Sequence, residues 1–304
     1  MKILITGAAG MLGTDLRSEL ISRFEIAGAG LVPSSQPHYT QTDLSVRKNV
    51  SDLLSREKPA VIFHTAAMTD VDGCETRQKE ALQANLEMTR LLTDEANRYG
   101  AQLVFFSTDY VFDGTKQGEY LESDVRKPVN FYGETKFLAE KYIGQHAENY
   151  AIFRITWLYG LHGKSFPRTI LERVKNQNKF EIVDDQKGRP TYTRDVARAF
   201  AELLAKDPLI FKNKGNTIYH LCNSGETNWA DFAAFIFEQA GHSGAEISRI
   251  DSSKSIRPAK RPLNSVLGLE KVRAGLGIHL RPWREAVLEF IREFQSETLL
   301  QEKK

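Results

Sequence analysis

Short apolar runs and helically spaced apolar positions alternate along the first half of the chain. Strands are predicted at residues 2–6, 25–30, 60–65, 102–107 and 151–156. The runs at 60–65 and 102–107 are continuously apolar, which is typical of strands that are covered on both faces. Between the predicted strands, apolar residues recur with helical spacing in segments that end near Ser22 and Arg56 and across 84–92, with Ser45 a candidate cap for the second segment. This alternation predicts a parallel sheet with right-handed crossovers.

The second half of the chain has a mixed pattern. Amphipathic helices are predicted around Val196, Trp229 and Trp283, and a strand is predicted at 217–222. The aromatic residues of these helices are interpreted as core, because they follow the helical period. The segment 109–130 shows no obvious element, and loops of that length are often functional. The last residues, 301–304, are expected to fray.

These patterns predict an α/β protein: a doubly wound parallel sheet (Rossmann-type) with a smaller C-terminal α/β substrate domain. We expect the dinucleotide-binding domain to comprise residues 1–156 plus about 178–225. The substrate domain is then expected to comprise about 157–177 plus 226–304.

Composition narrows the class of protein. The 304 residues are 41% hydrophobic and 26% charged, with a net charge of +2, which does not suggest a nucleic-acid or membrane-surface partner. The two cysteines, Cys74 and Cys222, form no CxxC pair and are compatible with a reducing, cytoplasmic location. No metal-ligand spacing of histidines is present, so no metal site is predicted, and no apolar run approaches the roughly 18 residues of a membrane span. The start of the chain reads as a strand rather than a signal peptide.

A glycine-rich segment follows the first predicted strand. Gly7, Gly10 and Gly13 have the spacing GxxGxxG, and Met11 and Leu12 begin the following helix. Glycine permits a tight turn and close approach of the backbone to a pyrophosphate, and a helix N-terminus supplies free N–H groups. The position between strand and helix therefore predicts dinucleotide binding.

The end of the second predicted strand bears on the choice of cofactor. No carboxylate stands there to bind an adenosine ribose, and Ser34 and Ser35 follow. This favours NADP(H), although no arginine is present at that point and NAD(H) is also compatible. Asp43, which precedes Leu44, is the next acid; it either binds the adenine amino group or caps the following helix, and the sequence does not decide between them.

A Tyr–Lys pair provides candidate chemistry. Tyr132 and Lys136 stand four residues apart and share one face of a predicted helix, and Thr108 ends a predicted strand. A neighbouring ammonium is expected to lower the pKa of the phenol, which can then act as an acid or base near neutral pH. A threonine hydroxyl can hydrogen bond to a substrate carbonyl.

These features together resemble the extended short-chain dehydrogenase/reductases and, within them, the dTDP-4-dehydrorhamnose reductase family. The resemblance covers nearly the whole chain. Its motifs are "GAAGMLG" (7–13), "HTAAMTDVDGCE" (64–75), "STDYVFDG" (107–114), "YGETK" (132–136), "RITWLYG" (154–160), "DDQKGRPT" (184–191) and "RPLNSVL" (261–267). The last two lie outside the general superfamily pattern and are the most specific.

The resemblance implies roles for individual residues. Tyr132 is expected to donate the proton. Lys136 is expected to adjust the pKa of Tyr132 and to anchor the cofactor ribose, and Thr108 is expected to hydrogen bond to the carbonyl. The implied reaction is NADPH-dependent reduction of the C4 ketone of dTDP-4-dehydro-β-L-rhamnose, a nucleotide-diphosphate sugar. The cofactor site is expected to include Gly7, Gly10, Met11, Leu12, Gly13, Ser34, Asp43, Leu44, Ala66, Ala67, Thr69, Tyr132 and Lys136. The substrate site is expected to include Thr69, Thr108, Asp109, Tyr132, Trp157, Arg261 and Asn264.

Several assignments have an alternative. Trp157 either borders the sugar pocket or belongs to the core, and Asn85 either supports the active-site lysine or is an ordinary surface residue. Segment 257–261 is either a diphosphate clamp or a solvated charged loop. Met68 stands where the family often has an aromatic residue, which leaves the sugar contacts open.

Two other functions fit the sequence. One is an epimerase or dehydratase of nucleotide sugars, although such enzymes retain NAD and are expected to carry the missing acid. The other is a non-catalytic subunit that resembles the regulatory subunit of methionine adenosyltransferase. A homodimer is compatible with the sequence, which does not fix the oligomeric state.

Overall fold

The computed structural model describes residues 1–213 and 217–301, and the expected frayed tail lies largely outside the described residues. The large sheet has the strand order β11-β6-β5-β4-β1-β2-β3, and every pairing in it is parallel. Its strands are β1 (Lys2–Thr6), β2 (Glu25–Gly30), β3 (Tyr39–Gln41), β4 (Val61–His64), β5 (Gln102–Thr108), β6 (Tyr150–Ile155) and β11 (Thr217–His220). This confirms the predicted doubly wound sheet.

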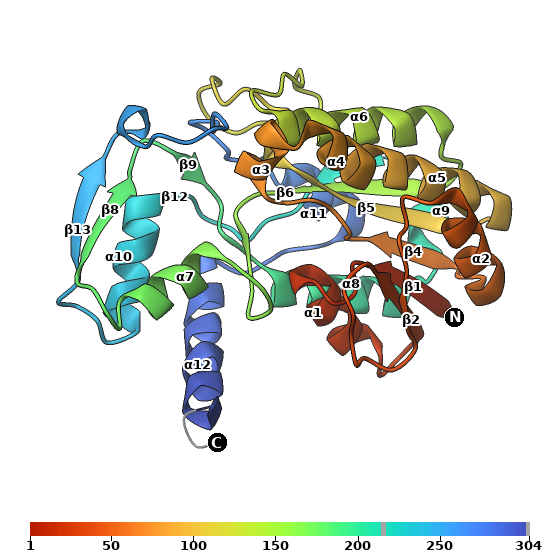
Figure 1. Ribbon diagram of the computed structural model, residues 1–304, viewed down its shortest axis with the longest axis horizontal. Coiled ribbons are helices and arrows are strands. Elements are labelled where there is room, and N and C mark those ends of the chain that lie inside the picture. Colours follow the sequence, from red (N-terminus) through yellow and green to blue (C-terminus); the bar gives the residue numbers. More distant parts are fainter. Residues whose placement is uncertain (214–216, 302–304) are drawn as a thin grey trace.

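Helices cover both faces of this sheet (Figure 1). One face carries α2 (Arg47–Glu57), α5 (Met88–Tyr99) and α6 (Phe131–His146). The other carries α1 (Met11–Leu20), α8 (Thr193–Lys206), α9 (Ile210–Asn213) and α11 (Glu270–Leu276). Short helices α3 (Val71–Thr76) and α4 (Gln78–Leu82) and the π-helical turn η1 (Gln83–Glu87) lead into α5.

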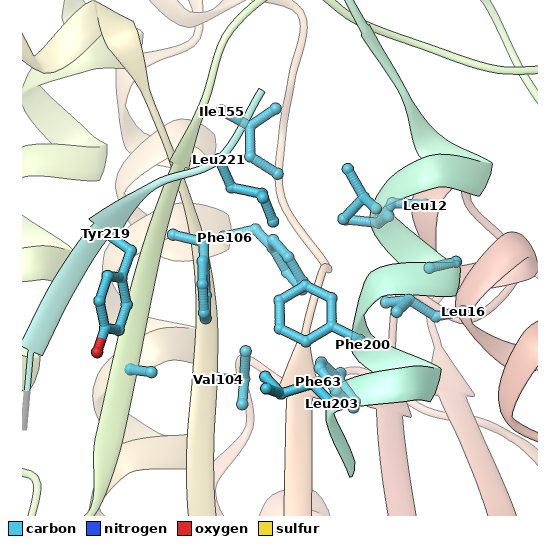
Figure 2. Close-up of a cluster of buried hydrophobic side chains, with 14 of the residues drawn as sticks. Leu12, Leu16, Phe63, Val104, Phe106, Ile155, Phe200, Leu203, Tyr219 and Leu221 are labelled. Carbon is cyan, nitrogen blue, oxygen red and sulfur yellow. The ribbon is translucent and has the colours of Figure 1, made fainter. Parts of the chain in front are cut away.

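Aromatic packing fixes α8 against the sheet. The Phe200 ring of α8 lies edge-on to Phe63, Phe106 and Phe153, with ring centroids 5.1, 5.5 and 4.9 Å away. Leu12 and Leu16 of α1 complete this cluster (Figure 2). Edge-to-face aromatic pairs add stability beyond the apolar area they bury. The core thereby holds the start of α1 at a fixed position relative to the ends of the strands.

A smaller lobe stands at one end of the sheet (Figure 1). It contains α7 (Phe166–Arg173), α10 (Trp229–Gln239) and α12 (Trp283–Gln301) around the third apolar cluster. Its strand pairs are parallel β8 (Lys179–Val183) with β13 (Glu246–Ile250) and antiparallel β9 (Lys187–Gly188) with β12 (Thr227–Asn228). The remaining elements are β7 (Leu158–Tyr159), β10 (Thr191–Tyr192) and the 3₁₀ turns η2 (Asp109–Val111) and η3 (Ser252–Lys254).

The expected domain boundaries differ from this arrangement in two segments. Strand β8 was expected in the cofactor domain, but it pairs with β13, and Phe180 packs on Phe237 of α10 at 4.8 Å between ring centroids. Helix α11 was expected in the substrate domain, but Val272 packs in the core of the large sheet. In both segments the apolar side chains, rather than position in the chain, decide which lobe the element joins.

The long segment 109–130 begins with η2 and then runs without regular structure to α6. Its side chains nevertheless anchor it. Tyr120 is buried, stacks on Phe112 at 4.4 Å between centroids and donates a hydrogen bond to Asp113. The Asp124 carboxylate accepts from Lys116 and from the Leu121 backbone.

Candidate active site

The glycine turn joins β1 to α1 and needs its glycines for steric reasons. Gly7 has φ +68°, and a Cβ there would lie 2.7 Å from the Ala66 backbone nitrogen. A Cβ on Gly13 would lie 2.2 Å from the Gly7 carbonyl oxygen. Gly7 and Gly10 line a cavity of about 950 Å³, called the main cavity below. Gly13 lies behind the turn and allows its close packing on α1.

The first turn of α1 is free to bind an anion. Its N-cap residue is Gly10, no side chain caps the helix, and the first turn carries no acidic residue. Backbone N–H groups at such a helix start point outward and meet the positive end of the helix dipole. Met11 and Leu12 line the cavity at this point. The turn therefore fits the pyrophosphate of a dinucleotide.

Thr108, Tyr132 and Lys136 meet at the carboxyl edge of the sheet. Thr108 ends β5, and the other two lie in the first turns of α6. Asn130 caps α6 by accepting a hydrogen bond from the Gly133 N–H at 2.8 Å. A Cβ on Gly133 would lie 2.1 Å from the Tyr110 carbonyl oxygen, so this glycine lets α6 approach η2 closely. All three predicted catalytic residues line the main cavity.

Burial dominates the electrostatics of this trio. Lys136 is 3% exposed, its ammonium lies 3.9 Å from the Phe105 ring centroid, and desolvation lowers its pKa to about 7. Desolvation also raises the pKa of Tyr132, and the charge of Asp109 adds to that effect, while a hydrogen bond with Thr108 opposes it. The expected lowering of the phenol pKa is therefore not found in the protein by itself, because burial and the Asp109 charge both raise it and the hydrogen bond with Thr108 offsets only part of their effect.

Asp109 is a buried carboxyl group beside the trio. It is 3% exposed, and its Oδ1 accepts a hydrogen bond from the Thr108 hydroxyl at 3.1 Å. Desolvation raises the pKa of Asp109 to about 6, against hydrogen bonds from Ser265 and Thr108 that lower it. A carboxyl with this pKa changes charge close to neutral pH.

Asn85 is buried within η1 and is not a surface residue. Its Oδ1 accepts a hydrogen bond from the Met68 N–H at 2.8 Å. Its Nδ2 donates to the Met68 carbonyl at 3.1 Å and to the Thr135 hydroxyl at 3.0 Å. Asn85 thus ties the loop after β4 to the turn of α6 that carries Lys136. The backbone N–H and carbonyl of Met68 are both held by Asn85.

One cavity of about 950 Å³ runs from the glycine turn past this trio. It brings together fourteen of the predicted site residues. These are Gly7, Gly10, Met11, Leu12, Asp43, Leu44, Ala66, Ala67, Thr69, Thr108, Asp109, Tyr132, Lys136 and Trp157. Four others lie outside its lining: Gly13, Ser34, Arg261 and Asn264.

The segment after β2 differs from the expectation. The Ser34 hydroxyl accepts a hydrogen bond from the Gln36 N–H at 3.3 Å, while Leu31 and Val32 line the cavity. The Gly30 position has no room for a side chain, because a Cβ there would lie 2.8 Å from the Tyr39 hydroxyl oxygen. Leu31 is therefore the position nearest the end of β2 that can present a side chain to the cavity.

Neither Asp43 nor Ser45 caps α2. The N-cap residue is Val46, and no side chain caps the helix. Asp43 Oδ1 instead accepts from the backbone N–H of Ser45 at 2.9 Å and from its hydroxyl at 2.7 Å, in a turn before the helix. The capping expectation was wrong because this turn takes up the short polar side chains one residue before the helix begins. Asp43 lines the cavity.

Two residues of the expected phosphate clamp are engaged elsewhere. Arg261 forms a two-pronged ion pair with Asp72, at 2.5 and 2.9 Å, and links the loop after η3 to α3. Asn264 donates both side-chain N–H groups, to the carbonyl oxygens of Lys116 and Gly118. Arg257 and Lys260 are exposed.

Trp229 lines the cavity although its helical period suggested a core residue. Its ring stacks on Trp157, with centroids 3.6 Å apart and planes 12° apart. Trp229 is the first residue of α10 and directly follows the N-cap Asn228. An aromatic residue at a helix start lies at the edge of the apolar stripe. That position was the one sign in the sequence that Trp229 could face the cavity rather than the core.

Among the described residues, no group of three or more His, Cys, Asp or Glu side chains is arranged to hold a metal ion. Within the same part of the chain, every helix is too short or too polar to cross a membrane.

Comparison with known proteins supports these observations. The profile of the family described as RmlD substrate binding domain matches residues 1–296. A dTDP-4-dehydrorhamnose reductase from Burkholderia thailandensis is 35% identical, over 98% of this chain and all of its own. The spore coat polysaccharide biosynthesis protein SpsK of Bacillus subtilis is 33% identical, over 97% of this chain and 98% of its own.

Solved structures of relatives have the same fold over nearly the whole chain. A dTDP-4-dehydrorhamnose reductase from Bacillus anthracis in complex with NADP superposes with a TM-score of 0.87 and 29% identity, over 96% of this chain and 99% of its own. A dTDP-4-dehydrorhamnose reductase from Clostridium acetobutylicum superposes with a TM-score of 0.88 and is 32% identical in sequence, over 97% of this chain and 100% of its own. A UDP-glucose 4-epimerase from Thermus thermophilus, at 20% identity, shares the fold. With its glycine turn, its Thr–Tyr–Lys trio and these full-length matches, the chain belongs to the dTDP-4-dehydrorhamnose reductase family.

Proposed function

We propose that this protein reduces the C4 ketone of dTDP-4-dehydro-β-L-rhamnose with NADPH to give dTDP-β-L-rhamnose. The observation that carries the proposal is that Thr108, Tyr132 and Lys136 line the same cavity as the glycine turn. A carbonyl bound beside Thr108 and Tyr132 is within reach of a dinucleotide that occupies that turn. The named activity of the full-length relatives supports this substrate.

The chain contributes binding, orientation and proton transfer. NADPH supplies the hydride. In the structure the single proton of the Thr108 hydroxyl, at the end of β5, goes to Asp109 Oδ1. When the substrate binds, this hydroxyl turns its proton to the ketone oxygen and stabilises the negative charge that develops there. Tyr132 Oη gives its proton to the same oxygen. Lys136, held by α6, favours the phenolate that remains and binds the cofactor ribose.

Residues around the trio would hold the two ligands. Ala66, Ala67 and Thr69 follow β4 and border the cavity between the glycine turn and the trio, so we place them along the cofactor and the sugar. Trp157 borders the same cavity beyond Thr108 and is placed at the sugar. Arg261 is our candidate for the substrate diphosphate, and binding would require it to share its guanidinium with Asp72.

We propose NADPH as the preferred cofactor and place the reaction in the cytoplasm. No acidic residue lies at the end of β2, where a carboxylate would repel a 2′-phosphate. The relative from Bacillus anthracis has NADP bound, which supports the preference. The cysteines, Cys74 and Cys222, are both buried free thiols, which is compatible with a reducing compartment.

The test is an NADPH-oxidation assay against a panel of nucleotide-linked 4-ketosugars. We expect turnover with dTDP-4-dehydro-β-L-rhamnose and much lower kcat/KM with UDP- or GDP-linked 4-ketosugars. Purified protein that oxidises no NADPH with any member of the panel would exclude the proposal.

A further inference from the structure

The backbone of Trp157 adopts a conformation that its own residue type disfavours. Trp157 has φ +48°, in the left-handed region that large side chains rarely occupy. It lies in the turn between β6 and β7, directly beyond the buried Thr156. Strained residues of this kind persist only when their surroundings hold them, and they concentrate at functional sites. The contacts of the Trp157 indole should therefore show what holds it.

Two neighbours restrain the Trp157 indole. The Trp229 ring covers it in a nearly parallel stack, 3.6 Å between centroids. Gly188 abuts the same indole: a Cβ at Gly188 would lie 2.5 Å from its Cε2 atom and 2.7 Å from its Nε1 atom. The indole is thus confined on more than one side, and any larger residue at 188 would displace it. Packed side chains with so few alternatives hold one rotamer.

Trp229 is itself anchored from the small lobe. Its Nε1 donates a hydrogen bond to Gln186 Oε1 at 3.1 Å, and Gln186 Nε2 donates to the Ser252 hydroxyl at 2.8 Å. Phe166 of α7 packs on it, with ring centroids 4.6 Å apart. Among the described residues that follow Lys164, Trp229 alone lines the main cavity. The core of the small lobe therefore reaches the cavity through this one ring.

We propose that Trp229 is a positioning residue for the sugar subsite. It holds Trp157 in its left-handed conformation, so that the indole forms a fixed wall beside the sugar ring. This inference rests on the proposed function, because it takes from it the placement of Trp157 at the sugar. It predicts an effect on the sugar alone, because Trp157 is the one proposed ligand contact among the residues that Trp229 is shown to stack on or hydrogen bond to.

The test uses Trp229→Leu and binding measurements on the protein saturated with NADPH. Calorimetry gives the affinity for dTDP-β-L-rhamnose, which cannot react with the reduced cofactor, and for dTDP alone. We expect the Kd of the sugar nucleotide to rise about tenfold, the loss expected when a wall that orders the ligand becomes loose. The Kd values of dTDP and of NADPH should stay within about twofold of wild type.

Two further variants separate positioning from general structure. Trp229→Phe keeps an aromatic ring on Trp157 and should restore the sugar-nucleotide Kd to within about threefold of wild type. Trp283→Phe removes the third tryptophan, which is buried in the same lobe away from the cavity, and should leave all three affinities unchanged. Circular dichroism should show loss of the signal from stacked indoles in Trp229→Leu and its retention in Trp283→Phe.

The outcomes distinguish this inference from the proposed function. If Trp229→Leu loses the stacked-indole signal yet binds dTDP-β-L-rhamnose as tightly as wild type, Trp229 positions nothing. An equal loss of affinity for dTDP alone would contradict a role confined to the sugar. Wild-type protein that binds the sugar nucleotide but reduces no ketone would overturn the reaction and leave the Trp229 comparison valid. Wild-type protein that does neither would overturn both.

Discussion

The Thr108 hydroxyl donates a 3.1 Å hydrogen bond to Asp109 Oδ1, so the residue placed at the ketone oxygen is oriented by a buried carboxyl group. Burial makes the ionised form of Asp109 costly, and the hydrogen bonds from Ser265 and Thr108 offset only part of that cost, which is why its pKa lies well above the usual value. The carboxyl group that orients Thr108 therefore lowers the free energy of unfolding when it is ionised.

Asp109→Asn should stabilise the protein and reduce its activity. The pKa of Asp109 is about 6 in the folded protein and about 3.9 in an unfolded chain, so the folded state binds more protons between these values. Stability therefore falls as pH rises from about 4 to 6. Removing the charge should raise the free energy of unfolding by up to about 3 kcal/mol at pH 7.5 and change little below pH 4. Urea unfolding at both pH values measures this, and a less stable mutant at pH 7.5 would contradict it.

Tyr132→Phe should abolish most turnover while NADPH binding stays nearly intact. Only the acidic hydroxyl is removed, and one general-acid group contributes roughly 10²–10⁴-fold to the rate. Single-turnover kinetics and a fluorescence titration with NADPH measure the two quantities separately. A mutant that turns over at a rate near wild type would remove Tyr132 from the mechanism.

Lys136→Met should weaken NADPH binding, lower kcat and move the alkaline limb of the pH–rate profile to higher pH. The last effect follows because the phenol loses the ammonium that favours its ionised form. Stability gives a second measurement. The pKa of Lys136 is about 7 when folded and about 10.4 when unfolded, so wild-type stability rises with pH between these values. In Lys136→Met that rise should be smaller; an unchanged pH dependence of rate and stability would reject the pairing.

Cofactor choice should respond at Leu31 more than at Ser34. Leu31 lines the cavity just after β2, whereas Ser34 lies outside it. Wild-type protein should use NADPH at least as well as NADH. Leu31→Asp should lower the NADPH/NADH ratio of kcat/KM about tenfold, because a carboxylate there repels the 2′-phosphate. Ser34→Asp is the matched control and should change the ratio less; a larger effect at Ser34 would show that the ribose lies elsewhere.

The sheet, and the meeting of Thr108, Tyr132 and Lys136 in one cavity, agree with the sequence-based expectation because both depend on local pattern. Continuous apolar runs mark strands buried on both faces, and a Tyr–Lys spacing of four fixes a shared helical face whatever surrounds it. Contacts between distant segments could not be predicted in this way. The pairing of β8 with β13, the ion pair of Arg261 with Asp72 and the stack of Trp229 on Trp157 each join residues more than 60 positions apart.

Local turn chemistry caused a second kind of error. Ser45 looks like a helix cap, but Asp43 accepts its hydrogen bonds one turn earlier. Likewise Ser34 follows β2 closely in sequence, yet the Tyr39 hydroxyl occupies the space above Gly30 and the chain turns away from the cavity. Both errors arise because short polar side chains hydrogen bond to whichever backbone lies nearest.

The most direct test of the proposed reaction follows the hydride itself. Wild-type protein is incubated with NADPH that carries deuterium at both hydrogen positions of nicotinamide C4 and with dTDP-4-dehydro-β-L-rhamnose, and the product is analysed by NMR and mass spectrometry. The account predicts one deuterium per molecule of dTDP-β-L-rhamnose, located at sugar C4, and almost no product in Tyr132→Phe. Deuterium at another carbon, or conversion of the sugar without consumption of NADPH, would contradict it.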